Sequence, residues 1–344
     1  MKKQDVAVAV DNGRQFMTGA SGRWAGERLL QALREGRAIS PRELRTADTL
    51  RKDEWKAFDE ALVEEGMIRL RGIADLMAAG LTIPVTGAMG KTIMEYEKVT
   101  DMNPAEVSLS GVVRTEDDRQ EFTLGNVPLP IIHKDFNLNL RTLTSSRNRG
   151  ESLDTSQARV AGRLVAEMLE QMLFLGSKTF GGSPIYGYLT HPDRNQIDFA
   201  TAGELWNAAG KTGEEILLDV LAMIAAAEAD RFFGPYWMYV PSNFSPKLEE
   251  DFKSNSDKSI RQRLMEVDRI AKIQTVDQLT ASNVVLAQAT QDVVALVTGE
   301  PLQSIQWDIE GGFVIKFKAF QIAVPLIRSD AQLRSGVVHL HSLA

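Results

Sequence analysis

Residues 129–176 constrain the fold of this chain more than any other stretch. The stretch begins as an extended segment over residues 129–143, passes through a polar turn, and ends as one long amphipathic helix. In that helix the large apolar side chains recur at helical spacing and form a single stripe: Val160, Leu164, Val165, Met168, Leu169, Met172 and Leu173. The stretch contains no catalytic motif.

The ends of this helix are marked by residues that favour caps. Asp154, with Gln157 three positions later, resembles a capping box, and Gly176 is placed to end the helix. We therefore predict a helix over residues 154–175. Met168 and Met172 sit at helical spacing and are interpreted as core or interface residues rather than as part of a cofactor site.

Composition places the chain among ordinary globular proteins. Of its 344 residues, 44% are hydrophobic and 25% are charged, which argues against intrinsic disorder. A formal net charge of -7 argues against a nucleic-acid binder of the basic type, although a mildly acidic wall could line a compartment that holds DNA. The chain has no cysteine, which excludes disulfides, thiolate metal sites and cysteine catalysis.

The remaining sequence indicates an α+β chain with at least two lobes. Residues 1–48 have few large apolar side chains and are interpreted as an arm with little core of its own. Residues 91–129 are polar and strand-like, and an isolated hairpin of this kind is only marginally stable, so we expect other chains to supply its burial. No apolar stretch is long enough to cross a membrane and no signal peptide is apparent, so the expected location is the cytoplasm.

From about residue 201 the pattern alternates between helix and strand. Ser245 and Pro246 are placed to begin a short helix as its N-cap and first-turn proline. The expected helices and strands of this part, in chain order, are a helix over 214–229, a buried strand over 235–240, a helix over 245–252, strands over 283–288 and 292–299, a long bent strand or strand pair over 313–327, and a closing strand over 336–343.

Two Gly-Lys-Thr triplets raise the possibility of a phosphate-binding loop. They lie at residues 90–92 and 210–212, but the glycine that the motif requires five positions earlier is replaced by Val85 and Leu205. Surface turns are therefore the favoured interpretation of both triplets.

No other pattern predicts catalysis or metal binding. His339 and His341 would share one face of a strand as half of a metal site, yet no supporting ligand has suitable spacing, so an ordinary polar pair is favoured. The acidic residues Glu116, Asp117, Asp118 and Glu121 are interpreted as a solvated turn. We predict no catalytic residues, no cofactor and no metal.

A series of short patterns then occurs in a fixed order over residues 49–344. Trp55 lies near the start of a helix, an Arg-Gly turn precedes the long helix, and the helix ends on an acidic residue followed by Phe-x-Gly. The residues that carry the series are Trp55; Leu129, Pro130, Phe136 and Leu138; Arg149, Gly150, Leu153 and Asp154; Glu170, Phe174 and Gly176; residues 184–190; residues 233–240; and Phe320, Gln321 and Val324. This order resembles that of tailed-phage major capsid proteins of the Hong Kong-type fold, in the branch that encapsulins share.

The resemblance implies a division of the chain into four parts. It implies an N-terminal arm at 1–48, an extended loop at 91–129, an axial domain at 206–299, and a peripheral domain made of 49–90, 130–205 and 300–344, in which residues 154–175 form the long "spine" helix.

The resemblance also implies function. The chain is expected to assemble with itself into an icosahedral shell, as the major capsid protein of a phage or prophage, in the virion after assembly in the host cytoplasm. Packaged DNA would be contacted non-specifically, portal, scaffolding or decoration proteins are further candidate partners, and no membrane is expected. One alternative is an encapsulin shell around a cargo enzyme. Another is a soluble enzyme with its site at the lobe junction near residues 186–194.

Four residues are the candidate intersubunit contacts. Trp24 and Leu29 are the expected anchors of the arm, because buried aromatic and apolar side chains tend to dominate interface energetics. Tyr96 and Phe122 are the corresponding candidates on the extended loop.

Overall fold

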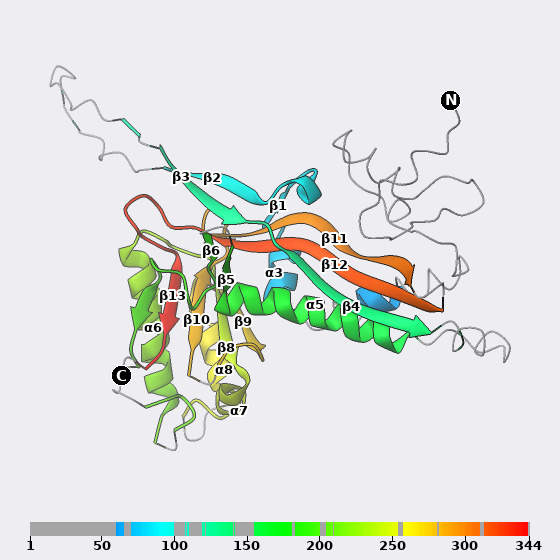
Figure 1. Cartoon of the computed structure of the whole chain (residues 1–344). Helices are drawn as coiled ribbons and strands as arrows, with labels where there is room; N and C mark the ends of the chain where they lie inside the picture. Colours follow the sequence, from blue (N-terminus) through cyan, green and yellow to red (C-terminus); the bar gives the residue numbers. More distant parts are fainter. Residues whose placement is uncertain are drawn as a thin grey trace, which may run out of the picture.

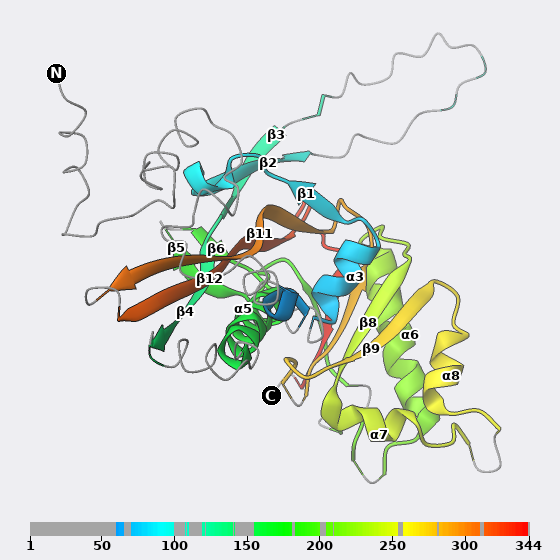
Figure 2. The same ribbon diagram turned by 90° about the vertical axis from the view of Figure 1, so that its right-hand side faces the viewer.

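The computed structural model of the chain describes residues 60–64, 70–99, 107, 109, 119–120, 122–139, 141, 155–180, 183–199, 204–208, 210–253, 257–280, 282–309 and 313–342. Two sheets lie beside each other, each with helices packed on it (Figures 1 and 2), which confirms the expected α+β class. The following lie outside the described residues: Trp24 and Leu29 of the arm, Trp55, the acidic residues Glu116, Asp117, Asp118 and Glu121, and Asp154.

The first sheet has four strands in the order β1-β11-β12-β4. β11 and β12 form a long antiparallel ladder, β4 pairs antiparallel with β12, and β1 pairs parallel with β11. The strands are β1 (Thr82–Pro84), β4 (Ile131–Asn139), β11 (Val294–Ile309) and β12 (Val314–Ile327). The region expected as a bent strand or strand pair at 313–327 is thus a single strand, and the predicted domain boundary at 299–300 falls inside β11.

The long helix α5 (Ser156–Leu175) packs along this sheet, as Figure 1 shows. It begins after Thr155, whose side chain makes no capping hydrogen bond. The short helix α3 (Gly72–Ala78) packs against α5, and a further helical piece covers residues 60–64. The predicted helix at 154–175 is therefore confirmed, with a start two residues later.

The buried face of α5 differs from the predicted stripe. Small residues make up much of it, and the buried residues of α5 are Ala158, Ala161, Gly162, Val165, Ala166, Leu169, Glu170, Met172, Leu173 and Phe174. A Cβ on Gly162 would lie 2.2 Å from the backbone oxygen of Leu62, so a side chain there would prevent the close approach of the 60–64 helix. Three larger residues of the predicted stripe, Val160, Leu164 and Met168, are instead exposed on the outer side of the helix.

The second sheet has five strands in the order β7-β13-β10-β8-β9. They are β7 (Asn195–Ile197), β8 (Tyr236–Pro241), β9 (Ile270–Val276), β10 (Val284–Gln288) and β13 (Val337–Leu340). Every residue of β8 is buried, because the sheet is covered on both sides. Trp237 and Tyr239 join the core beneath the first sheet, while Tyr236 and Met238 face a separate core under the helices.

The helices of this second layer are α6 (Gly213–Ala229), α7 (Ser245–Leu248) and α8 (Ile260–Met265). The single turn η4 (Ser242–Phe244) directly precedes α7, and a second one, η3 (Ala88–Gly90), follows β1. Thr212 and Glu215 form a capping box at the start of α6. Ser245 is already inside α7, whose N-cap is Phe244, so the predicted N-cap is wrong by one residue. No helix in the described part is long and apolar enough to span a membrane.

Two small hairpins complete the fold. β2 (Ile93–Val99) pairs with β3 (Phe122–Pro128), and β5 (Ser177–Phe180) pairs with β6 (Ser183–Ile185). The β2–β3 hairpin lies at the edge of the molecule, where its strands lead away from the sheets (Figure 1). This is the base of the segment expected as an extended loop.

Candidate assembly surfaces

The β2–β3 hairpin carries apolar side chains that the described residues of the chain leave exposed. Phe122 is 63% exposed and Leu124 is 69% exposed, both on β3. Across the ladder Leu124 is opposite Glu97, so the hairpin offers this side chain no apolar partner in register. A two-stranded ladder of this kind gains most of its stability from contacts beyond itself.

The base of the hairpin is nevertheless fastened to the body of the same chain. Lys98 Nζ donates to Ser329 Oγ at 2.9 Å, and Ser329 Oγ in turn donates to Asp193 Oδ2 at 2.5 Å. We call these three residues the hairpin latch. Arg328 stacks over the Tyr96 ring at 5.6 Å from its centroid, so adjacent residues of one segment hold two positions of β2.

A second attachment holds β3. Ser183 Oγ on β6 donates to Asn126 Oδ1 at 2.6 Å. Gly125, the cross-strand partner of Tyr96, has no space for a Cβ, which would lie 2.6 Å from the Tyr96 ring. The direction in which the hairpin leaves the body is therefore set by contacts within the subunit.

These contacts place the candidate residues of the loop differently. Tyr96 is partly buried against the core and beneath Arg328, and burial raises the pKa of its hydroxyl. Phe122 is open to solvent at the outer end of the ladder. Their roles as intersubunit contacts stay predictions, with Phe122 the better placed of the two for contact with a neighbour.

The outer side of α5 forms a second exposed apolar surface. Val160, Leu164 and Met168 recur every four residues and are 46%, 36% and 37% exposed. Residues four apart lie on one side of a helix, so the three form a continuous strip.

The far end of α5 holds α3 in place through a buried carboxylate. Glu170 accepts three backbone hydrogen bonds, from Arg71 at 3.1 Å, Gly72 at 2.7 Å and Ile73 at 3.1 Å. These are unpaired donors at the start of α3, and a carboxylate is well suited to them. Burial raises the pKa of Glu170 although the three donors act to lower it. The sequence marked Glu170 only by resemblance, and its capping of another helix had no local signal.

The two sheets are tied together by α3. Asp75 accepts from Tyr239 Oη of β8 at 3.4 Å and forms an ion pair with Lys272 of β9. Near this junction the rings of Phe174, Tyr188 and Tyr239 pack against one another, with centroids 5.2–5.9 Å apart. The junction is thus densely packed rather than open.

The two Gly-Lys-Thr triplets have different environments. Residues 90–92 are exposed, which confirms the predicted surface turn. At residues 210–212 the prediction is wrong for the lysine, because the Lys211 side chain is fully buried and its Nζ lies 3.1 Å from Asp219 Oδ2. Trp206 Nε1 donates to the same oxygen at 2.8 Å. Lys211 is therefore a structural cation beneath α6 rather than a phosphate ligand.

The two C-terminal histidines stack on each other and are held by other side chains. Their ring centroids are 4.2 Å apart. His339 Nδ1 accepts from Arg194 Nε at 3.2 Å, and its Nε2 lies 2.7 Å from Asn283 Oδ1. Burial, with His341 and Arg194 nearby, lowers the pKa of His339 to about 3. Within the described residues no group of three His, Cys, Asp or Glu could hold a metal.

The lobe junction at 186–194 was the proposed place for an enzyme site. Its nearest arrangement to a nucleophile is the hairpin latch, but Ser329 already accepts from Lys98 and donates to Asp193. The Lys98 ammonium that donates to the same hydroxyl stabilises the oxygen in place, so both partners of Ser329 attach the hairpin to the body. Burial also lowers the pKa of His191 to about 4, and its Nδ1 accepts from the Asp193 backbone at 3.3 Å. The geometry favours positioning over catalysis here.

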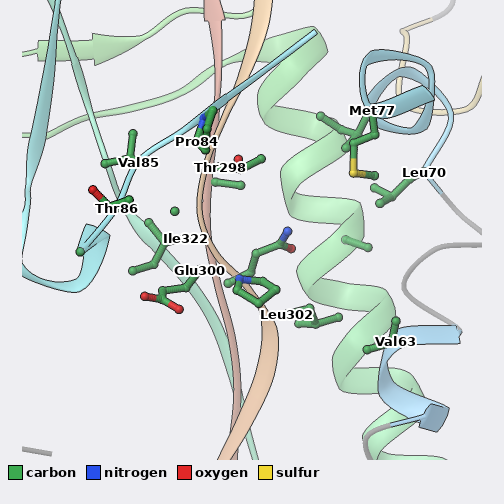
Figure 3. Close-up of a pocket in the computed structure, with 17 residues that line it drawn as sticks. Val63, Leu70, Met77, Pro84, Val85, Thr86, Thr298, Glu300, Leu302 and Ile322 are labelled. Carbon is green, nitrogen blue, oxygen red and sulfur yellow. The ribbon is translucent and has the colours of Figure 1, made fainter. Parts of the chain in front are cut away.

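An apolar groove of about 820 Å³ opens beside α5 (Figure 3). Its walls come from the 60–64 helix and α3 on one side, and from the turn after β1 with the middle of β11 and β12 on the other. The lining includes Val63, Leu70, Ile73, Met77, Val85, Leu302 and Ile322, and its one charged residue in the described part is Glu300.

Comparisons with known proteins match this architecture. A family model described as a family of unknown function (DUF6260) matches residues 45–339. The chain belongs to this family. Among curated proteins, this DUF6260 member is 25% identical over 238 residues to the type 1 encapsulin shell protein EncA of Myxococcus xanthus, covering 68% of this chain and 71% of that protein.

Solved structures establish the fold. The chain matches the virus-like particle of Pyrococcus furiosus with a TM-score of 0.59 and 17% identity, over 84% of this chain and 99% of that chain. It matches the capsid of Myoviridae phage XM1 with a TM-score of 0.57 and 14% identity, over 78% of this chain and 91% of that one. The fold is therefore the Hong Kong-type capsid fold, as the order of sequence patterns predicted.

Proposed function

We propose that this chain is the structural subunit of a closed icosahedral shell, and that the shell is the capsid of a phage or prophage. The observation that carries the proposal is the β2–β3 hairpin. It projects from a capsid-type fold, is fixed in direction by Lys98, Tyr96 and Asn126, and presents exposed Phe122 and Leu124. A fixed arm with uncovered apolar residues suits a contact that every subunit repeats on its neighbour around a symmetry axis.

Electron microscopy of the purified protein tests this proposal most directly. Closed hollow particles are expected, together with a size-exclusion profile at the void volume. Only monomers or dimers, at high concentration and across several salt conditions, would contradict it. A matched variant, Phe122→Asp with Leu124→Asp, should fold normally and assemble poorly because it places charges on the exposed side of β3.

A shell around a cargo enzyme is the second candidate, favoured by the match to an encapsulin shell protein. The contents of the particles distinguish the two. Nuclease-protected DNA, with portal and terminase genes nearby, supports the capsid; a co-purifying enzyme and no such genes support the encapsulin. In the capsid case DNA would meet the shell non-specifically, portal, scaffolding or decoration proteins would be further partners, and the subunit would assemble in the host cytoplasm before residing in the virion.

The proposed role needs no catalytic residue. An enzyme at the lobe junction would depend on groups such as His191, Asp193 and Ser329. His191 Nδ1 accepts a hydrogen bond from the Asp193 backbone. Ser329 accepts from Lys98 and donates to the Asp193 carboxylate. Alanine variants at His191 and Ser329 are therefore expected to change particle stability rather than any turnover.

A further inference from the structure

The apolar groove beside α5 has the form of a docking site. Its volume of about 820 Å³ falls in the range of sites that hold a ligand or several side chains. Leu70, Ile73 and Met77 line one wall, while Val63 at its end is 42% exposed. Figure 3 shows Leu70 and Met77 on one side of α5 and Val85, Thr86 and Ile322 on the other. Apolar surface of this kind gains free energy when a second apolar surface covers it.

One charged group sets the chemistry of the occupant. Glu300 is only 7% exposed, and no hydrogen bond or ion pair within the described part of the chain engages it. Burial accordingly raises the pKa of its carboxyl group. A carboxylate whose hydration is reduced by its surroundings is stabilised by a cation placed beside it. The groove therefore fits an apolar segment that carries a basic side chain at one edge.

The chain itself contains such a segment ahead of the described residues. In the helical pattern of residues 24–34, Leu29 and Leu33 are four apart, and Leu30 lies three before Leu33 and four before Arg34. Residues at these spacings share one side of a helix, so the leucines form a stripe with Arg34 at its edge. Amphipathic helices that lay such a stripe into a groove are a recurrent mode of recognition.

The position of the groove also favours this segment. The first described residue, Glu60, belongs to the helix that supplies Val63 to the groove wall. The intervening residues 35–59 span at most roughly 90 Å when extended, which is long enough to reach the groove of the same copy or of an adjoining one. We propose that residues 24–34 of this chain occupy the groove, with Leu29, Leu30 and Leu33 against its apolar walls and Arg34 on Glu300.

Disulfide trapping tests the docking directly, because the native chain has no cysteine. Leu33→Cys with Leu302→Cys should form a disulfide in most molecules under mild oxidation. A band within one chain or between two chains supports the proposal equally and identifies which copy supplies the segment. The matched control is Leu44→Cys with Leu302→Cys, which places the first cysteine outside the segment. Equal yields at positions 33 and 44 would overturn the proposal.

Charge variants test the pairing of Arg34 with Glu300. Arg34→Gln and Glu300→Gln should each lower the disulfide yield at limiting oxidation by about tenfold, the usual effect of losing a charged hydrogen bond. The double variant should lose no more than either single variant, because both remove one interaction. If the losses of disulfide yield add in the double variant, Arg34 and Glu300 do not form a pair. Arg42→Gln is the control for the loss of a positive charge outside the segment.

Accessibility of the groove gives a readout that does not depend on a disulfide. Thr86→Cys, at an exposed position on the groove lining, should react slowly with a maleimide in the full chain and much faster once residues 1–48 are removed. The same rate in both forms would overturn the proposal, whether the groove is open in both or closed by another part of the chain. Binding of a different apolar peptide in the groove of the full chain would also contradict the proposal.

The inference is separable from the proposed function. The trapping and accessibility experiments can be run on unassembled subunits as well as on particles. Shells that form while the groove stays reactive would leave the shell proposal standing and remove this one. A trapped segment in a protein that never assembles would do the reverse.

Discussion

The body of the subunit and its projecting hairpin are built from similar strands but bury them differently. Beneath α5, the side chains of Leu169 and Leu173 are completely buried, and the four-stranded sheet closes over them. On the β2–β3 hairpin, Phe122 and Leu124 are mostly exposed, and the attachments to the body are polar or cation–π contacts at its base. The difference separates two tasks: the body supplies stability, while the hairpin supplies a fixed, uncovered surface.

The two sides of α5 give the sharpest test of this division. Leu169→Asp would bury a carboxylate at a position with no exposure, and we expect a loss of about 4 kcal/mol or more, enough to unfold the subunit. Denaturant titration or recovery of soluble protein measures the effect. An unchanged melting curve would show that the core beneath α5 is not the source of stability.

Leu164→Asp is the matched control on the same helix. Its side chain belongs to the exposed outer strip, so the subunit should fold with a loss below about 1 kcal/mol. Sequence periodicity alone places Leu164 and Leu169 on one stripe and predicts equal damage. The structure predicts very different results, and any defect at Leu164 should appear in assembly instead.

The second largest effect is expected at the carboxylate that caps α3. Glu170→Ala removes the acceptor of three backbone hydrogen bonds and leaves buried donors unpaired, which should cost about 3 kcal/mol. Glu170→Gln keeps one acceptor oxygen and should cost less. Equal losses in the two variants would mean that the charge, rather than the hydrogen bonds, holds α3 in place.

The body should also respond to acid through His339. Its pKa in the folded chain is about 3, below the usual value of about 6.5, so the unfolded chain takes up the proton first as the pH falls. The contribution to stability is complete above about pH 6.5 and is lost as the pH falls toward 3. His339→Gln should flatten this dependence by up to about 1.4 kcal/mol per pH unit. Parallel curves for the two proteins would contradict the assignment.

Removal of the outer loop tests the other side of the comparison. Replacing residues 100–121 by a short Gly-Ser linker keeps the latch and the Tyr96 contact, so the subunit should melt within about 1 kcal/mol of the parent. Closed particles should no longer form. Deleting 95–122 instead also removes Tyr96 and Lys98, and should loosen the segment around Arg328 and Ser329. Normal particles from the shorter deletion would contradict the assembly role.

How far the sequence predicted this molecule depends on the range of the interactions. Periodicity found α5, α6 and the fully buried strand β8, because those patterns are local. It could not show that Ala158, Ala161 and Gly162 are buried while Val160 and Leu164 are exposed, since the close approach of Leu62 to Gly162 comes from a distant part of the chain. Buried Lys211 looked like a turn residue because its partner Asp219 lies on the following helix. The hairpin latch joins residues far apart in the chain, and no single-sequence pattern marks it.

The smallest expected effect concerns that latch. Ser329→Ala removes the hydroxyl between Lys98 and Asp193 and should lower global stability by only about 1 kcal/mol, because the core is untouched. Hydrogen exchange should nevertheless rise at the amides of β2, since the base of the hairpin loses one of its attachments. Ser183→Ala, at the β3 attachment, is the matched control and should act on β3 instead. If both variants loosen both strands equally, the hairpin moves as one unit and its direction is not set by separate contacts. If Ser329→Ala changes particle size while the subunit stays folded, the direction of the hairpin is a determinant of how subunits meet.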